Sequence, residues 1–137
     1  MPITAANIVL VVACALVDSD GRVLVAERPA GKNMAGLWEF PGGKVERGET
    51  PEAALIRELK EELSIDVTAA CLAPLSFASH AYDDFHLLMP LYVCRKWDGQ
   101  IVPREGQNTQ WKKPRDLFDL AMPPADRPLI AALRDAL

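Results

Sequence analysis

Apolar and polar residues alternate in short blocks along the N-terminal part of the chain, which is typical of β-strands. Ile8 to Val17 is apolar and rich in β-branched residues, and Arg22 to Glu27 alternates polar with apolar positions. Both patterns predict strands. Asp18 to Gly21 between them has the composition of a tight turn. We therefore expect the chain to open with a β-hairpin.

The next segment predicts a loop and one short strand. Arg28 to Leu37 contains Pro29, Gly31 and Gly36 and reads as a loop. Trp38 to Phe40 is long enough only for a short strand, because the Pro41-Gly42-Gly43 sequence is expected to end it.

The segment from Gly48 to Leu63 has the clearest helical pattern. Thr50 is a suitable N-cap, and Pro51 fits the first helical position. At 100° per residue, four apolar side chains gather on one side as a core-facing stripe. These residues are Leu55, Ile56, Leu59 and Leu63.

The remaining pattern predicts strands and helices that do not alternate regularly. Strands are expected over Ile65–Phe77, Phe85–Trp97 and Asn108–Lys112, and helices over Pro114–Leu120 and Asp126–Leu137. Without a regular βαβ rhythm, we expect a mixed β-sheet with helices packed on it, of the α+β kind. No linker composition interrupts the chain, so residues 1–137 are predicted to form one domain.

Composition excludes several classes of protein. The 137 residues carry a net charge of −4, which argues against a basic surface for stable nucleic-acid binding. No apolar run is long enough to span a membrane. The 3 cysteines lack metal-ligand spacing and predict reduced thiols, so we expect a cytoplasmic protein. The apolar Ile8 to Val17 does not suit a signal peptide, because no Lys or Arg precedes it.

Glutamates crowd one side of the predicted helix. Glu58 lies three residues before Glu61 and four before Glu62, so their carboxylates are neighbours on the helical surface and repel one another. Such carboxylates suit a hard divalent cation, and magnesium prefers oxygen ligands. A solvated acidic face is the competing interpretation of this run taken alone. Other phosphate-binding patterns are absent, because Gly42-Gly43-Lys44 continues with Val45 and forms no P-loop.

The complete spacing of these residues resembles the signature box of the Nudix hydrolase family. Gly43 is followed after five residues by Glu49, and after seven more by Arg57-Glu58-Leu59 and then Glu61-Glu62. Ile65 fills the final apolar position of the box. One position departs from it, because Ser64 stands where the family has glycine. Serine can adopt the left-handed backbone expected there at a cost near 1 kcal/mol.

Further stretches resemble the MutT branch of this family, whose members hydrolyse oxidised or otherwise modified nucleoside triphosphates. These stretches are Trp38–Lys44, Arg104–Gln107 and Pro123–Asp126. The resemblance implies an α/β/α sandwich around a mixed β-sheet. It also implies a Mg²⁺ cofactor, with Mn²⁺ as a substitute, and a nucleoside triphosphate that is cleaved to a monophosphate and pyrophosphate.

The resemblance also implies roles for individual residues. Glu58, Glu61, Arg57 and Glu105 are expected in catalysis. Gly42, Glu58, Glu61, Glu62 and Glu105 are expected to ligate metal. Arg57 is expected to orient the glutamates, with Gly43 and Glu49 in support. Glu58 and Glu105 are both candidates for the general base, with Glu58 favoured. The residues expected to contact the substrate are Arg28, Asn33, Glu39, Phe40, Pro41, Gly42, Tyr82 and Asp126.

Several of these substrate-contact assignments have structural alternatives. Phe40 either packs against the base or lies in the core, and Arg28 is either a ligand or a surface charge. Asp126 stands where well-known MutT proteins have asparagine. When ionised it can only accept hydrogen bonds from a base edge, and it could instead cap the terminal helix. His80 and His86 near the pocket mouth are expected to be structural or surface residues.

The leading function implied is hydrolysis of 8-oxo-dGTP to 8-oxo-dGMP and pyrophosphate, which cleans the nucleotide pool used in DNA replication. Asp126 motivates an alternative, a pyrophosphohydrolase of CTP or 5-methyl-dCTP. Two other interpretations are a catalytically silent nucleotide sensor and a DNA-repair module, and the latter lacks a basic face. The pattern leaves open whether the protein is a monomer or a homodimer.

Overall fold

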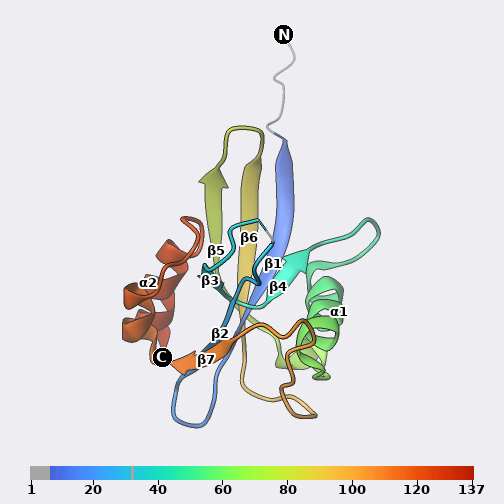
Figure 1. Ribbon diagram of the computed structural model, residues 1–137. Coiled ribbons are helices and arrows are strands. Elements are labelled where there is room, and N and C mark those ends of the chain that lie inside the picture. The colour runs from blue at the N-terminus through green and yellow to red at the C-terminus, as the bar shows by residue number, and fades with distance from the viewer. Residues whose placement is uncertain (1–6, 32) are drawn as a thin grey trace.

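Two β-sheets and two α-helices make up the fold of the computed structural model, which describes residues 7–31 and 33–137 (Figure 1). The strands are β1 (Ile8–Leu16), β2 (Val23–Glu27), β3 (Trp38–Glu39), β4 (Gly42–Lys44), β5 (Ala73–Ala81), β6 (His86–Cys94) and β7 (Thr109–Lys112). The helices are α1 (Pro51–Leu63) and α2 (Arg127–Ala136), with short 3₁₀ helices η1 (Ala69–Cys71) and η2 (Pro114–Asp119).

The strands divide between a mixed sheet and an antiparallel one. The larger sheet has the order β4-β1-β6-β5, in which β1 and β6 run parallel and the other neighbours antiparallel. The smaller sheet has the order β3-β2-β7 and is antiparallel throughout. The prediction of a mixed sheet with helices on it is confirmed, and the second sheet is an addition that the hydrophobic pattern did not predict.

Alternate residues of β1 point to opposite faces of the larger sheet, as in any strand. Val12, Cys14 and Leu16 are buried in one core cluster with Leu55 and Leu59 of α1. The intervening Ala13, Ala15 and Val17 are buried in the other cluster, with Leu129, Ile130 and Leu133 of α2. The helices therefore cover opposite faces of the sheet, as Figure 1 shows, and the fold is a sandwich.

The predicted N-terminal hairpin is wrong, although its turn is correct. The Asp18 carboxylate accepts hydrogen bonds from the backbone N–H groups of Asp20 and Arg22 at 3.0 and 2.8 Å, which closes the turn. Only Val17 and Val23 then pair across it. Strand β2 is buried on both faces and takes β3 and β7 as partners in the second sheet. Turn chemistry reverses the chain but does not choose the strand's partners.

Pro41 marks a crossing between sheets, not the end of strand structure. Before it, β3 pairs with β2. After it, β4 pairs with β1, with Gly42 opposite Ala13. The Pro41 carbonyl accepts a hydrogen bond of 2.9 Å from the Cys14 N–H. The junction of the two sheets therefore lies directly beside the glycines that precede α1.

The strand expected over residues 65–77 is also partly wrong, because β5 begins only at Ala73. The preceding segment contains the isolated pair Asp66–Asp98 and the 3₁₀ helix η1. Its apolar residues Ile65, Val67 and Leu72 are buried from an irregular backbone. The sequence therefore predicted a strand from apolar residues that are buried on an irregular segment. In the part of the chain that is described, no helix combines the length and apolar character that a membrane span needs.

Candidate active site

Helix α1 is fixed at both ends. At its start the Thr50 hydroxyl accepts a hydrogen bond of 3.1 Å from the Ala53 N–H, as an N-cap does, and Pro51 follows. At its end Ser64 is left-handed, with φ of 65°, and its hydroxyl donates to the Val102 carbonyl at 3.3 Å. The expected backbone conformation at Ser64 is confirmed. The helix therefore presents its glutamates in a fixed register.

Arg57 joins the loop before α1 to the glutamates on it. Its guanidinium donates to both carboxylate oxygens of Glu49, from Nε at 2.8 Å and from Nη2 at 2.9 Å. Nη1 donates to Glu58 at 2.9 Å and to Glu61 at 3.3 Å, and Nη2 also reaches the Lys44 carbonyl at 3.2 Å. These bonds to Arg57 lower the pKa of Glu49 to about 2. The orienting role that the resemblance implies for Arg57 matches this geometry.

A polar cleft of about 220 Å³ lies between α1 and the junction of the two sheets. The residues that line it are Ala26, Glu27, Arg28, Pro29, Glu39, Pro41, Gly42, Gly43, Glu58, Glu62, Glu105 and Gln107. Its glycines are required by close contacts: a Cβ at Gly43 would overlap the Glu58 carboxylate, and one at Gly42 would overlap the Val12 carbonyl. The two glycines thus let the helix and both sheets converge.

The Glu62 carboxylate is buried among other acidic side chains of this cleft. Burial, together with the nearby charges of Glu58 and Glu39, raises the pKa of Glu62 to about 8, although the Gly42 N–H donates to its carboxylate. In residues 7–31 and 33–137 no three acidic, His or Cys side chains converge tightly enough to enclose an ion by themselves. The oxygen donors nevertheless suit a hard divalent cation, which takes a few carboxylates and completes its shell with water and substrate phosphates.

The structure separates Glu61 from the other expected metal ligands. Its side chain is 59% exposed, bonds to Arg57 and does not line the cleft. Glu105, more than forty residues beyond the helix in sequence, does line the cleft beside Glu58 and Glu62. Of the carboxylates expected to ligate metal, Glu58, Glu62 and Glu105 therefore face the same cavity, together with Glu27 and Glu39, whereas Glu61 faces Arg57 and solvent.

A wider pocket of about 540 Å³ continues from the cleft, because Arg28 and Glu39 line both. Of the residues expected to contact substrate, Arg28, Asn33, Glu39, Tyr82 and Asp126 all line this pocket. Pro41 and Gly42 line the smaller cleft. Segments distant in sequence are thus brought together around a polar cleft and a larger, partly apolar pocket.

Asp126 faces the wider pocket and does not cap helix α2. It stands at the N-cap position, but its side chain makes no capping hydrogen bond, and the residue is only 5% exposed. Burial and the nearby Glu39 raise its pKa to about 7, while a hydrogen bond from the Phe40 N–H and the charge of Arg28 act in the opposite direction. The capping alternative is therefore wrong.

Phe40 lies in the core, whereas Arg28 lines both cavities. Phe40 is 4% exposed, packs in the core cluster of α2 and lines neither cavity, so the expected contact of its ring with a base is not seen. Its backbone N–H instead holds Asp126. Arg28 is a partly exposed charge that lines both cavities, with its side chain 35% exposed. Its Nε lies 3.3 Å from Glu39 Oε2 and is buried without a well-aligned acceptor among the described residues.

Sequence reasoning missed several residues that line the wider pocket. They include Lys44, Asp84, Phe85, Met89, Pro123 and Ala125. Phe85 had been read only as the start of a strand, and a ring at a hairpin tip gives no periodic signal. The expected surface or structural roles of the histidines fit better, because His86 lies 2.6 Å from the Ser79 hydroxyl and neither His80 nor His86 lines the pocket.

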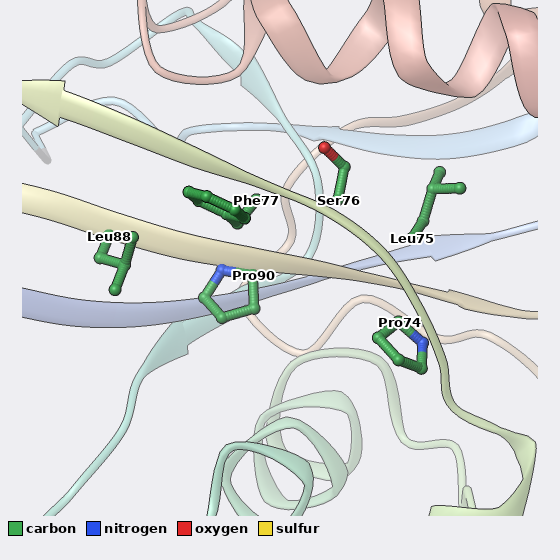
Figure 2. Close-up of a pocket in the computed structure, with 6 residues that line it drawn as sticks. All are labelled: Pro74, Leu75, Ser76, Phe77, Leu88 and Pro90. Atoms are coloured by element: carbon green, nitrogen blue, oxygen red, sulfur yellow. The ribbon is translucent and has the colours of Figure 1, made fainter.

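An apolar groove of about 450 Å³ lies elsewhere, on β5 and β6 (Figure 2). Its lining residues are Pro74, Leu75, Ser76, Phe77, Leu88 and Pro90, none of which carries a charge. It lacks the ligands that a cation or a phosphate group needs. The polar cleft and the adjoining pocket are therefore the candidate active site.

Comparison with known proteins agrees with this assignment. Residues 12–132 match the family model described as the NUDIX domain. The 8-oxo-dGTP diphosphatase of Proteus vulgaris is 42% identical over 89 residues, which cover 65% of this chain and 78% of that protein. The CTP pyrophosphohydrolase of Escherichia coli is 38% identical over 123 residues, which cover 88% of each chain.

Solved structures show the same fold. The solution structure of the E. coli ORF135 protein superposes with a TM-score of 0.85 at 32% identity, covering 98% of this chain and 94% of that one. The family model spans most of the chain, including α1, every residue of the polar cleft and most residues of the wider pocket. Nudix hydrolases use a divalent metal, which the acidic cleft suits. The chain belongs to the Nudix family and is a MutT-like Nudix hydrolase.

Proposed function

We propose that this enzyme hydrolyses 8-oxo-dGTP to 8-oxo-dGMP and pyrophosphate with Mg²⁺ as its cofactor. The observation that carries the proposal is the continuity of the two cavities through Arg28 and Glu39. A carboxylate-lined cleft adjoins a larger, partly apolar pocket, which matches a nucleotide whose phosphates need cations and whose base needs a flat, selective site. The 8-oxo-dGTP diphosphatase relatives support this substrate.

The proposed reaction breaks one phosphoanhydride bond. A water oxygen attacks the β-phosphorus, the bond from this phosphorus to the oxygen that bridges it to the α-phosphorus breaks, and nucleoside monophosphate leaves. A bound divalent cation supplies neutralisation of the phosphate charge, which phosphoryl transfer requires. We assign Glu58, Glu62, Glu105 and the Gly42 carbonyl to hold it. Glu61 does not line the cleft and would have to turn away from Arg57 to become a further ligand.

Glu58 is the general base in this account. It lies in the cleft, where Arg57 donates to one of its oxygens at 2.9 Å, and we assign it both a share in holding the cation and acceptance of the proton of the attacking water. Arg57 itself is held by Glu49. Positioning of this kind is how a protein contributes to phosphoryl transfer without forming a covalent bond to the substrate.

A second candidate substrate is CTP or 5-methyl-dCTP, and Asp126 is the observation that favours it. A buried carboxylate that caps no helix is available to accept from the 4-amino group of cytosine. With a pKa of about 7, Asp126 is present in both protonation states near neutral pH. It can therefore also donate to a carbonyl such as that of oxidised guanine. The CTP pyrophosphohydrolase relative supports this alternative.

The two substrates are separated by comparing kcat/KM for 8-oxo-dGTP and 5-methyl-dCTP in the wild type and in Asp126→Asn. The proposal predicts that the wild type prefers 8-oxo-dGTP, and that the ratio shifts at least about fivefold in the variant, since one lost base contact is worth about 1–3 kcal/mol. Asp119→Asn, at an exposed position, is the control. A wild-type preference for 5-methyl-dCTP would replace the leading substrate, and an unchanged ratio would remove Asp126 from base recognition.

We further propose that the enzyme acts on the free nucleotide pool of the cytoplasm. Its cysteines, Cys14, Cys71 and Cys94, are all free thiols in the structure, as suits a reducing compartment. The net charge of −4 fits a small-molecule substrate better than stable nucleic-acid binding. Sedimentation would show whether the enzyme is a monomer or a homodimer.

A further inference from the structure

The hairpin that joins β5 to β6 carries an organised set of aromatic rings. Ala81 pairs with His86 at the ends of the two strands, and the Tyr82 N–H donates to the Phe85 carbonyl at 2.8 Å. This short connection brings the side chains of Tyr82 and Phe85 to the same side of the turn.

The rings of Tyr82 and Phe85 are stacked on one another. Their centroids lie 5.0 Å apart with an angle of 23° between the planes, and the His80 ring meets Tyr82 edge-on at 4.7 Å and 65°. Offset stacking and edge contact are the favourable arrangements for aromatic pairs. Tyr82 is therefore held from two sides, and its ring orientation is set before any ligand arrives.

This aromatic set belongs to the pocket and not to the core. Neither Tyr82 nor Phe85 is a member of the two core clusters, and each is only partly buried. Both line the wider pocket together with Asp126. Burial and the charge of Asp126 raise the pKa of the Tyr82 hydroxyl, which agrees with an acid and a ring that face one another across the cavity. Core packing does not account for two partly buried rings at a hairpin tip that line the pocket.

We propose that Phe85 is a specificity-determining residue of the nucleoside pocket, where it holds Tyr82 in orientation and widens the aromatic surface for a bicyclic base. The proposal rests on the proposed function and deepens it by assigning purine nucleotides as the preferred class. Phe85 acts in part through Tyr82, so it is a positioning residue and takes no part in phosphoryl transfer.

The physical reason is preorganisation together with contact area. A ring that is already fixed loses little side-chain entropy when a base stacks on it, so more of the stacking energy appears as affinity. A purine covers more of a two-ring surface than a pyrimidine does. Loss of Phe85 should therefore weaken purine binding more than pyrimidine binding, and it should leave the distant Glu58 undisturbed.

The test is steady-state kinetics of Phe85→Ala, Phe85→Leu and Phe85→Tyr with 8-oxo-dGTP and 5-methyl-dCTP. Phe77→Ala is the matched control, because Phe77 lies on β5, is 63% exposed and belongs to the apolar groove of Figure 2. We expect Phe85→Ala to raise KM for 8-oxo-dGTP about 5- to 150-fold, the range of one lost stacking contact. We expect kcat of Phe85→Ala to stay within about twofold of the wild type, and its KM for 5-methyl-dCTP to change less than its KM for 8-oxo-dGTP. Phe85→Tyr, which keeps a ring, should have a KM close to that of the wild type.

Phe85→Leu keeps the apolar volume without the ring, so a raised KM in a normally folded Leu variant supports the stacking role even where the Ala variant does not fold. An unchanged KM in both folded variants, or equal KM changes for both nucleotides, would overturn the inference while the proposed function stands. A wild type that hydrolyses neither nucleotide would overturn the proposed function and this inference with it. A raised KM in Phe77→Ala equal to that of Phe85→Ala would also overturn the inference.

Discussion

At the scale of single residues, Arg57 connects the loop that precedes α1 to the carboxylates that α1 presents. It makes two bonds to Glu49, one to Glu58 and one to Glu61, so one planar cation sets the positions of three acids. Glu58 alone among these three lines the cleft. The residue expected to take the proton is therefore positioned by residues that do not contact the substrate.

Replacing Glu58 with glutamine should remove the proton acceptor while leaving the size of the side chain unchanged. We predict that Glu58→Gln lowers kcat about 10²- to 10⁴-fold, the usual contribution of a general base. Circular dichroism should show an intact fold. Asp119→Asn, at an exposed position outside the cleft, is the control and should keep kcat within about twofold. Near-normal turnover by folded Glu58→Gln would contradict the role of Glu58.

Replacing Arg57 with lysine keeps the charge but loses the planar fork that binds Glu49 and Glu58 together. We predict that Arg57→Lys lowers kcat about 10- to 100-fold with little change in KM, since small displacements of catalytic groups are costly. Arg47→Lys, at an exposed position in the same loop, serves as the control. A kcat equal to that of the wild type would show that charge alone suffices at this position.

Asp126 should make stability depend on pH. Its raised pKa of about 7 means that the folded state holds this proton more tightly than the unfolded state, whose carboxyl has a pKa near 3.8. The Asp126 carboxyl therefore costs stability progressively as the pH rises from about 4 to 7, and the cost stays constant above. Asparagine cannot ionise. The melting temperature of Asp126→Asn should thus exceed that of the wild type by several degrees at pH 8.

The same comparison at pH 5 should show a smaller difference, and the exposed Asp119→Asn serves as the control variant. Differential scanning fluorimetry across this pH range is sufficient. A gap of constant size between pH 5 and pH 8 would mean that the Asp126 carboxyl titrates near its ordinary value in the folded enzyme.

At the scale of secondary-structure elements, α1 is the element that the sequence predicted most completely. Its N-cap, its first proline and its buried leucines were all predicted, because each depends on neighbours within a few residues. The strand partners of β2 were not, since pairing depends on burial across the molecule. Turn residues indicate that the chain reverses direction, but they do not indicate which sheet the next strand joins.

The C-terminal end of α1 offers a stability test. Ser64 holds a left-handed φ of 65°, where glycine avoids a steric penalty, but its hydroxyl also donates to the Val102 carbonyl. We predict that Ser64→Gly raises the free energy of unfolding by up to about 1 kcal/mol. Ser64→Ala, which loses the hydroxyl and keeps the strain, should lower it. Urea denaturation measures both, and a Gly variant no more stable than the Ala variant would contradict the strain argument.

Candidate-site residues divide by the kind of signal that located them. The spacing of Glu58 and Glu62 places both on one helical face, so sequence alone could bring them together. Glu105 and Asp126 reach the cavities from distant segments, and only the family resemblance singled them out. Phe40 was expected against the base, yet its ring is turned into the core. Phe85 was missed altogether, because its place in the pocket depends on the geometry of one hairpin.

At the scale of the whole molecule, the active site occupies the place where the two sheets meet. The chain crosses from β3 in the smaller sheet to β4 in the larger one at Pro41, and α1 follows within a few residues (Figure 1). The acidic cleft lies beside this crossing, and the wider pocket extends from it toward the β5–β6 hairpin and the start of α2. In the proposed function, the phosphates and the base of the substrate would thus meet different parts of the fold.

We propose that this arrangement of cleft and pocket makes the protein a metal-dependent nucleoside triphosphate pyrophosphohydrolase. The most direct measurement is the release of pyrophosphate and of orthophosphate from 8-oxo-dGTP, dGTP, CTP and 5-methyl-dCTP, with Mg²⁺ and with a chelator. We predict that pyrophosphate is released without orthophosphate, that this release depends on Mg²⁺, and that it is fastest for 8-oxo-dGTP. Orthophosphate as the product, hydrolysis that persists in the chelator, or silence on all four nucleotides would contradict it.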